Sequence, residues 1–243
     1  MSESAVETEP NLQNLPVHVG IIMDGNGRWA QNKNLPRSKG HWEGMNTAKA
    51  IAAAAADIGL KYLTLYVFST ENWKRTEQEV GFLMNLIHTN LCEQFEFYKS
   101  HHIKIEHIGN IEGLPPIIQN DIVTIKKETA HFTGLTLVLA INYGGKDEIV
   151  RGIKKLISEN DSADSITEDL VAKSFDVPSL PDMDLLIRTG GEKRLSNFLL
   201  WHSAYAELLF TDTLWPDYNK GEFYNDIIQF QKRTRRFGAV LTK

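Results

Sequence analysis

The sequence predicts a single α/β domain with a mainly parallel central sheet flanked by helices. Short apolar runs of strand length alternate along the chain with longer segments of helical period, which is the pattern of such sheets. Several of the short runs are apolar on both faces, as strands buried inside a parallel sheet are. At 243 residues the chain is long enough for one large domain.

The expected strands are rich in β-branched, aromatic and leucine residues, which suit a buried sheet. They cover residues 17–23, 62–68, 103–108, 135–141 and 184–188, and a short sixth strand is expected near 208–211.

Helices are expected over residues 44–58, 80–99, 115–130 and 146–158. Gly59 suits the position that follows a helix C-terminus, and apolar residues of the second segment recur at helical spacing. The polar, proline-containing residues 159–182 are interpreted as a surface excursion rather than a domain boundary. The domain is therefore expected to span 17–243, preceded by a flexible tail over 1–16.

The composition excludes several classes of protein. Apolar residues make up 42% and charged residues 23%, with a net charge of -5, so a protein that coats nucleic acid is not expected. With the single cysteine Cys92, neither a disulfide framework nor any cysteine-based zinc site is expected. No apolar run approaches the ~18–20 residues that cross a bilayer, and the polar start MSESAVETEP is unlike a signal peptide. We expect a cytoplasmic protein.

Polar and glycine-rich residues follow the C-terminal ends of four expected strands, in the loops 24–29, 69–75, 142–146 and 189–197. In an open parallel sheet these ends lie at one edge, where such folds bind ligands. The loops are therefore predicted to form an active site there.

Arginines are concentrated in and beside these loops: Arg28, Arg37, Arg75, Arg188 and Arg194. The planar guanidinium group matches phosphate oxygens two at a time, and glycine lets backbone N–H groups approach an anion closely. The pattern predicts a site for two diphosphate groups.

Each of these residues also has an ordinary structural explanation. The glycine pair Gly25 and Gly27 suits a tight turn, Asp24 could cap a helix, and Trp29 and Trp73 could serve packing alone. Neither a dinucleotide-binding fingerprint nor a P-loop is present. Among the histidines only His41, behind Arg37, is expected to contact phosphate or move a proton; His88 and the rest are interpreted as core or surface residues.

Four long motifs resemble those of one known family, the cis-prenyltransferases (Z-isoprenyl diphosphate synthases), and within it the bacterial undecaprenyl diphosphate synthases. The motifs occur in family order and are HVGIIMDGNGRWAQNKNLPRSKGHWEG, FSTENWKR, INYGG and DLLIRTGGEKRLSNFLLWHSAYAELLFTDTLWPDY. The resemblance covers roughly residues 17–238. The DDxxD motif of trans-prenyltransferases is absent from the sequence.

The resemblance implies a Mg²⁺-dependent transferase that condenses isopentenyl diphosphate successively onto farnesyl diphosphate, with each new double bond cis. The implied product is a long-chain polyprenyl diphosphate, undecaprenyl diphosphate, the carrier lipid of peptidoglycan and cell-wall synthesis. The growing hydrocarbon needs a hydrophobic tunnel, with the segments 80–99, 103–108 and 135–141 as expected walls. Core packing remains the alternative role for each of those residues.

The resemblance also assigns roles to single residues. The catalytic residues are Asp24, Asn72 and His41, and Mg²⁺ is held at Asp24 with support from Glu207. The substrate-binding residues on the allylic side are Gly25, Asn26, Gly27, Arg28, Trp29, Arg37, His41 and Arg75. The loop that positions the reacting groups supplies Ser69, Thr70, Glu71, Asn72 and Trp73. Isopentenyl diphosphate is expected at Arg188, Arg194 and Ser196.

A homodimer is implied by the C-terminal residues Arg236, Phe237 and Gly238, which resemble a segment that reaches the partner's site. The basic run over 232–236 could touch anionic lipid, but solvation at a helix surface is the preferred interpretation, so membrane contact is expected to be transient at most.

The chain departs from the family pattern at five positions that touch none of the residues above: Lys146, Thr76, Asn110, Phe132 and His202. Two alternatives stay open. One is a non-catalytic partner subunit, although such subunits lack the first-motif aspartate and the arginines that this chain retains. The other is a synthase of the same family with a shorter product.

Overall fold

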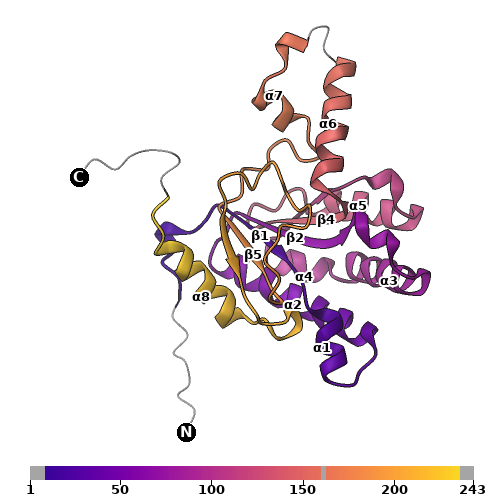
Figure 1. The fold of residues 1–243 in the computed structure, drawn as a ribbon, viewed down its shortest axis with the longest axis vertical. Helices are drawn as coiled ribbons and strands as arrows, with labels where there is room; N and C mark the ends of the chain where they lie inside the picture. The colour runs from indigo at the N-terminus through magenta and orange to yellow at the C-terminus, as the bar shows by residue number, and fades with distance from the viewer. Residues whose placement is uncertain (1–8, 160–162, 236–243) are drawn as a thin grey trace.

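The computed structural model describes residues 9–159 and 163–235. Their strands form one central sheet (Figure 1). The strand order is β3-β4-β2-β1-β5-β6, and every neighbouring pair is parallel. The strands are β1 His18–Ile22, β2 Tyr62–Ser69, β3 Lys104–Ile108, β4 Thr136–Tyr143, β5 Leu185–Arg188 and β6 Glu207–Phe210. The six strands expected from the sequence are confirmed.

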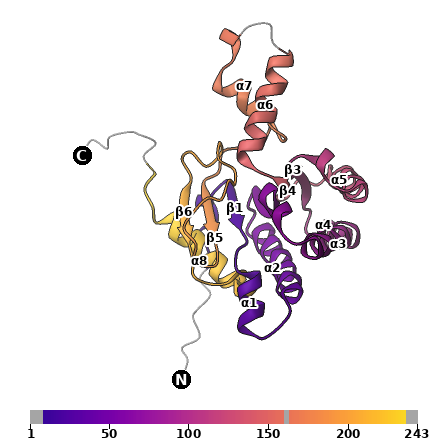
Figure 2. The ribbon, with the colours of Figure 1, turned by 45° about the vertical axis from the view of Figure 1, so that its right-hand side comes forward.

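The helices connect these strands and flank the sheet. They are α1 Asn26–Asn32, α2 Arg37–Asp57, α3 Glu77–Glu93, α4 Phe95–Ser100, α5 Pro116–Thr129, α6 Gly145–Glu159, α7 Glu168–Lys173 and α8 Lys220–Gln231. Short 3-10 turns lie at Leu12–Asn14, Thr70–Lys74, Ile111–Gly113, Ala163–Ser165 and Trp215–Asp217. In both views α6 and α7 project together from the rest of the molecule (Figures 1 and 2).

Several helix predictions were wrong in their bounds. Helix α2 begins at Arg37 rather than at residue 44, because Pro36 is extended and the chain turns helical directly after it. The segment 80–99 is two helices, since the backbone leaves helical geometry at Gln94. Gly59 does follow the end of α2 with φ of 76°, as predicted.

The sheet separates two apolar clusters because side chains alternate along each strand. Val19 and Ile21 face the larger cluster, which α2, α3, α5 and α8 cover. Ile22 faces the smaller one, which contains Phe198 and Met183. The second face is thus covered by loop segments that lack regular helix or strand, since Val177, Leu180, Met183, Phe198 and Leu199 all come from turns and loops.

The segment 159–182 is less superficial than expected from its polar composition. Its described later part buries Phe175, Val177 and Leu180, and the last two belong to the smaller cluster. The surface interpretation therefore fails for this part. Within the expected tail, the described residues Asn11 and Asn14 are held by Gln231 of α8. In the described part of the chain, no helix is both long and apolar enough to span a membrane.

Candidate active site

The C-terminal edge of the sheet carries a cavity of about 730 Å³ at the place where the strand order reverses. From β1 the chain builds β2 on one side and later adds β5 on the other, so the loops after these three strands meet. Three of the four predicted loops therefore line the cavity. The fourth, after β4, lies behind it: Lys146 donates its backbone N–H to the Asn197 side chain at 2.9 Å.

Asp24 lies directly after β1 and is held by two arginines. Its Oδ1 accepts from Nη2 of Arg28 at 3.0 Å and its Oδ2 from Nη2 of Arg188 at 2.9 Å. The next residue, Gly25, has φ of 118°, and a β-carbon there would press on the backbone of Leu214 at 3.0 Å. Only glycine can therefore make this turn without strain.

Arg188, the last residue of β5, fixes the loop that follows it. Its side chain is only 4% exposed, and Nη1 donates to the Arg194 carbonyl at 2.6 Å and to Oγ of Ser196 at 2.7 Å. The guanidinium group thereby joins Asp24 to the loop predicted to bind isopentenyl diphosphate. Arg194 is more exposed and pairs with Glu192.

Glu79 of α3 organises the other basic side chains, and the sequence did not reveal it. Its Oε1 lies 2.9 Å from Arg75, 3.0 Å from Arg37 and 3.3 Å from Nε2 of His41. Burial lowers the pKa of His41, while the contact with Glu79 acts in the opposite direction. Two local signals could have found Glu79: the Thr76-x-x-Glu79 spacing of a helix start and the i,i+4 spacing of Arg75 and Glu79, and both contacts form in the structure.

The loop after β2 presents its polar side chains from a short 3-10 turn. The side chain of Asn72 accepts from the Ser69 backbone at 3.1 Å, and Asn197 donates to Glu71 at 2.9 Å. These contacts tie the loop after β2 to the loop after β5. Asn197 lines the cavity and was also missed by the sequence analysis.

Most predicted site residues reach the cavity, but four do not. Those that line it are Asp24, Gly25, Asn26, Gly27, Arg28, Arg37, His41, Ser69, Glu71, Asn72, Arg75, Arg188, Arg194 and Ser196. Trp29 instead donates to Asp217 at 2.6 Å, and Trp73 donates to Asn142 at 2.8 Å. Thr70 lies beside Gly144, outside the cavity lining.

Glu207 is the fourth residue outside the cavity. It begins β6, level with Leu185, and pairs with Arg233 at 2.8 Å, so it lies at the amino end of its strand. The described chain does not bring it to Asp24, and its support of Mg²⁺ stays a prediction.

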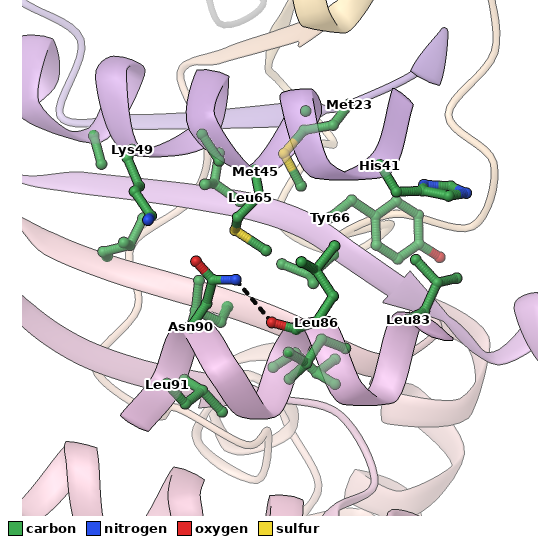
Figure 3. Close-up of a pocket in the computed structure, with 18 of the residues that line it drawn as sticks. Met23, His41, Met45, Lys49, Leu65, Tyr66, Leu83, Leu86, Asn90 and Leu91 are labelled. Carbon is green, nitrogen blue, oxygen red and sulfur yellow. Dashed lines mark hydrogen bonds between the residues drawn. The ribbon is translucent and has the colours of Figure 1, made fainter. Parts of the chain in front are cut away.

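A second, apolar pocket adjoins the polar cavity between α2 and α3 (Figure 3). The two share the lining residues Met23, Asn26, His41, Tyr66, Val67 and Leu83. Deeper in, the walls are Ala48 and Ala52 of α2, Leu86 and Leu91 of α3, and Leu137 of β4. The polar cavity therefore leads directly into an apolar interior.

The donor set at the polar cavity fits a magnesium ion. Mg²⁺ prefers oxygen ligands and is commonly bound by one or two carboxylates together with substrate phosphates. Asp24 supplies a carboxylate at the cavity wall. Beside it, Oδ1 of Asn26 is buried and has no hydrogen-bond partner among the described residues, so a second oxygen is free to accept a ligand.

Comparison with known proteins agrees with this geometry. The family described as putative undecaprenyl diphosphate synthase matches residues 22–238. An isoprenyl transferase of Treponema denticola is 57% identical over 91% of this chain and 96% of its own length. The (2E,6E)-farnesyl-diphosphate-specific ditrans,polycis-undecaprenyl-diphosphate synthase of Micrococcus luteus is 46% identical over 95% of this chain and 94% of its own.

Solved structures show the same likeness in three dimensions. Lavandulyl diphosphate synthase from Lavandula x intermedia, in complex with dimethylallyl diphosphate, superposes with a TM-score of 0.89 at 32% identity, covering 92% of this chain and 98% of that one. A probable undecaprenyl diphosphate synthase of Campylobacter jejuni gives 0.79 at 33% identity, over 93% and 99%. The chain therefore belongs to the undecaprenyl diphosphate synthase family of isoprenyl transferases, the cis-prenyltransferases.

Proposed function

We propose that the chain condenses isopentenyl diphosphate units successively onto farnesyl diphosphate, with each new double bond cis, to make undecaprenyl diphosphate for cell-wall carrier lipid. The observation that carries the proposal is the union of an arginine-lined polar cavity with an apolar pocket. A diphosphate suits the first and a hydrocarbon chain suits the second. The farnesyl diphosphate and undecaprenyl diphosphate named for the Micrococcus luteus relative both have this two-part chemistry.

In the proposed reaction the allylic C–O bond breaks and diphosphate leaves with its electron pair. The alkene of isopentenyl diphosphate forms the new C–C bond, and loss of one proton restores a double bond. Arg28, Arg37 and Arg75 face the same cavity and would stabilise the negative charge on the departing oxygens. The helix and loop contacts described above hold these groups in place before substrate arrives.

Asp24 and Asn26 would hold Mg²⁺, which when bound neutralises diphosphate charge and assists its departure. Asp24 also aims Arg28 and Arg188 toward the cavity by pairing with each through a separate carboxylate oxygen. Arg188, Arg194 and Ser196 would bind the diphosphate of the second substrate. Asn72 and His41 are proposed as the residues nearest the reacting carbons, because both line the cavity.

The apolar pocket would receive the growing chain. Each buried CH₂ group contributes about 0.8 kcal/mol, so elongation into the pocket is favourable while diphosphate stays at the polar end. The pocket is the start of the proposed tunnel, and its far walls would set the product length.

We propose a homodimer in which β6 of each subunit lies at the interface. The reason is that β6 is an edge strand of the sheet and exposes the apolar side chain of Leu208. The residues 236–238, on which the sequence prediction of a dimer rested, lie outside the described residues. The charged diphosphate substrates fit the cytoplasmic location predicted from the sequence, with only transient membrane contact when product leaves.

Incubation with farnesyl diphosphate, radiolabelled isopentenyl diphosphate and Mg²⁺ tests the proposal, with the extracted products resolved by chain length. We expect a ladder that ends at undecaprenyl diphosphate. A shorter end point would keep the chemistry and change the biological role. Absence of incorporation although both substrates bind would favour the non-catalytic partner-subunit alternative.

A further inference from the structure

Helix α3 carries chemistry on the side that the apolar pocket does not use. Leu83, Leu86 and Leu91 line that pocket. His88 and Cys92, one helical turn apart, instead meet Asp121 of α5. Neither the polar cavity nor the apolar pocket contains any of these three residues.

The three side chains converge on one point. Nδ1 of His88 lies 2.7 Å from Oδ2 of Asp121, Sγ of Cys92 lies 3.3 Å from Oδ1 of Asp121, and Sγ lies 3.6 Å from the same Nδ1. In the described part of the chain this is the group of histidine, cysteine and acidic residues whose ligand atoms all lie within 4.8 Å of one another.

The arrangement is not that of a nucleophilic relay. In a relay the histidine uses one ring nitrogen toward the nucleophile and the other toward the carboxylate. Here the same nitrogen of His88 faces both Cys92 and Asp121. Three donor atoms directed at a common point are what a metal ion requires instead.

The charge balance of the cluster also favours a cation. The Asp121 side chain is only 11% exposed. Among the described residues its ion-pair partner is His88, which carries charge only when it is protonated. A carboxylate buried to this degree is costly unless it is paired or bound to a metal. A divalent ion would compensate this carboxylate charge.

We propose that His88, Cys92 and Asp121 form a Zn²⁺ site that links α3 to α5. Sulfur, nitrogen and oxygen ligands suit zinc, whose tetrahedral ligands at ~2.0–2.3 Å from the metal stand ~3.3–3.6 Å from one another. The Sγ–Nδ1 separation of 3.6 Å already matches. Asp121 presents Oδ2 to His88 at 2.7 Å and Oδ1 to Cys92 at 3.3 Å, so its carboxylate must turn to place one oxygen on the metal and move that oxygen away from His88. Cys92 is exposed, so a water molecule can take the fourth position.

The site selects zinc over the magnesium proposed for catalysis, because thiolate and imidazole are poor ligands for a hard cation. The absence of a second cysteine excludes sites built from cysteines alone, but it does not exclude this mixed set, which only the packing of α3 on α5 assembles. Since α3 is also a wall of the apolar pocket, zinc would fix that wall from outside.

Metal binding to the full chain tests the proposal without any prenyl substrate, so its outcome is independent of the proposed function. The chain is stripped with a chelator and titrated with Zn²⁺ by calorimetry in excess Mg²⁺, and separately with Co²⁺. We expect one Zn²⁺ per chain and a thiolate-to-cobalt charge-transfer band in the near ultraviolet. Zn²⁺ should also raise the melting temperature, because it binds the folded form.

Three variants assign the site. Cys92→Ser should lose the charge-transfer band, and both Cys92→Ser and Asp121→Asn should weaken zinc binding at least tenfold. His131→Gln, an exposed histidine outside the cluster, should bind as the unaltered chain does. Circular dichroism of the metal-free variants checks that each is folded. The proposal is overturned if the unaltered chain binds no Zn²⁺. It is also overturned if Cys92→Ser and Asp121→Asn bind Zn²⁺ as tightly as the unaltered chain does.

Discussion

Both carboxylate oxygens of Asp24 carry an arginine, Arg28 on one and Arg188 on the other. Asp24→Ala removes the proposed magnesium ligand and releases both arginines, so we expect turnover to fall by at least ~10³-fold. The fold should persist, with a loss of about 1–3 kcal/mol in the free energy of unfolding, because buried Arg188 loses one partner and keeps two others.

Steady-state incorporation of isopentenyl diphosphate and urea unfolding measure the two effects on Asp24→Ala. Asp169→Ala, an exposed acidic residue of α7, is the matched control and should change neither. Near-normal turnover of Asp24→Ala would contradict the assigned role.

Glu79 shows where residue-level sequence reasoning ends. Asp24 and the arginines could be predicted because they follow strand ends, whose convergence in a parallel sheet is a rule of the fold. Glu79 lies in the first turn of α3 and pairs with its near neighbour Arg75 and with Arg37 and His41 of α2. The Arg75–Glu79 pair has a local i,i+4 spacing, but only the packing of α3 against α2 brings Arg37 and His41 to Glu79, and no local spacing encodes those two contacts.

Glu79→Gln should raise KM for farnesyl diphosphate about tenfold, equivalent to ~1.4 kcal/mol, because a neutral amide no longer holds the two arginines in position. Glu77→Gln, exposed in the same helical turn, is the control and should leave KM unchanged. Initial rates at varied farnesyl diphosphate give the answer. A lower KM in Glu79→Gln would mean that Glu79 competes with the diphosphate for these arginines.

At the level of elements, the strands were predictable and the helix boundaries less so. Continuous apolar runs mark buried parallel strands, and all of them were located within a residue or two. Helices α1, α7 and α8 went unpredicted because they are short or carry weak periodicity. Helix α8 begins at a capping box of Asn219 and Glu222, a signal that the sequence analysis overlooked.

Glu148 of α6 contacts Tyr143 of β4, and its environment leads us to expect that the free energy of unfolding depends on pH. It accepts a hydrogen bond from Tyr143 at 2.5 Å, and burial raises the pKa of Glu148 to about 7 from 4.5. Between these values the unfolded chain releases a proton that the folded chain keeps, so the stabilising contribution is full below 4.5 and is lost as pH rises through 7. The loss reaches about 3 kcal/mol at ~1.4 kcal/mol per pKa unit.

Glu148→Gln retains an acceptor for Tyr143 and cannot ionise. Its free energy of unfolding, relative to the unaltered chain, should therefore rise by about 3 kcal/mol between pH 4 and pH 8. Urea unfolding across that range measures the difference, with exposed Glu168→Gln as the control. A difference that does not vary with pH would show that Glu148 is ionised in the folded chain.

For the whole molecule, the two halves of the proposed substrate site come from different physical sources. The polar cavity depends on sheet topology, which places the loops after β1, β2 and β5 together. The apolar pocket depends on helix packing, where small residues of α2 face larger ones of α3 and leave about 110 Å³ of space over the sheet (Figure 3). Sequence pattern could predict the first, but it could not separate pocket walls from ordinary core, because both are apolar.

Filling the pocket should therefore separate the two halves. Ala52 of α2 lines the apolar pocket and does not line the polar cavity. Ala52→Phe places an aromatic ring in the path of the growing chain, so we expect the first condensation to proceed at close to the normal rate and the final product to be shorter. Ala50→Phe, exposed on the same helix, adds the same ring outside the pocket and should leave product length unchanged.

Chain-length analysis of both alanine variants, with the rate of the first condensation measured in the same reactions, decides the matter. If Ala52→Phe still makes the full-length product, the growing chain does not pass this point and must leave the polar cavity by another route. If the first condensation is lost while the fold is retained, the ring has disturbed the diphosphate site through the shared wall at Met23 and His41. Only a shortened product with an unchanged first condensation supports the proposal that the apolar pocket limits product length while condensation takes place in the arginine-lined cavity.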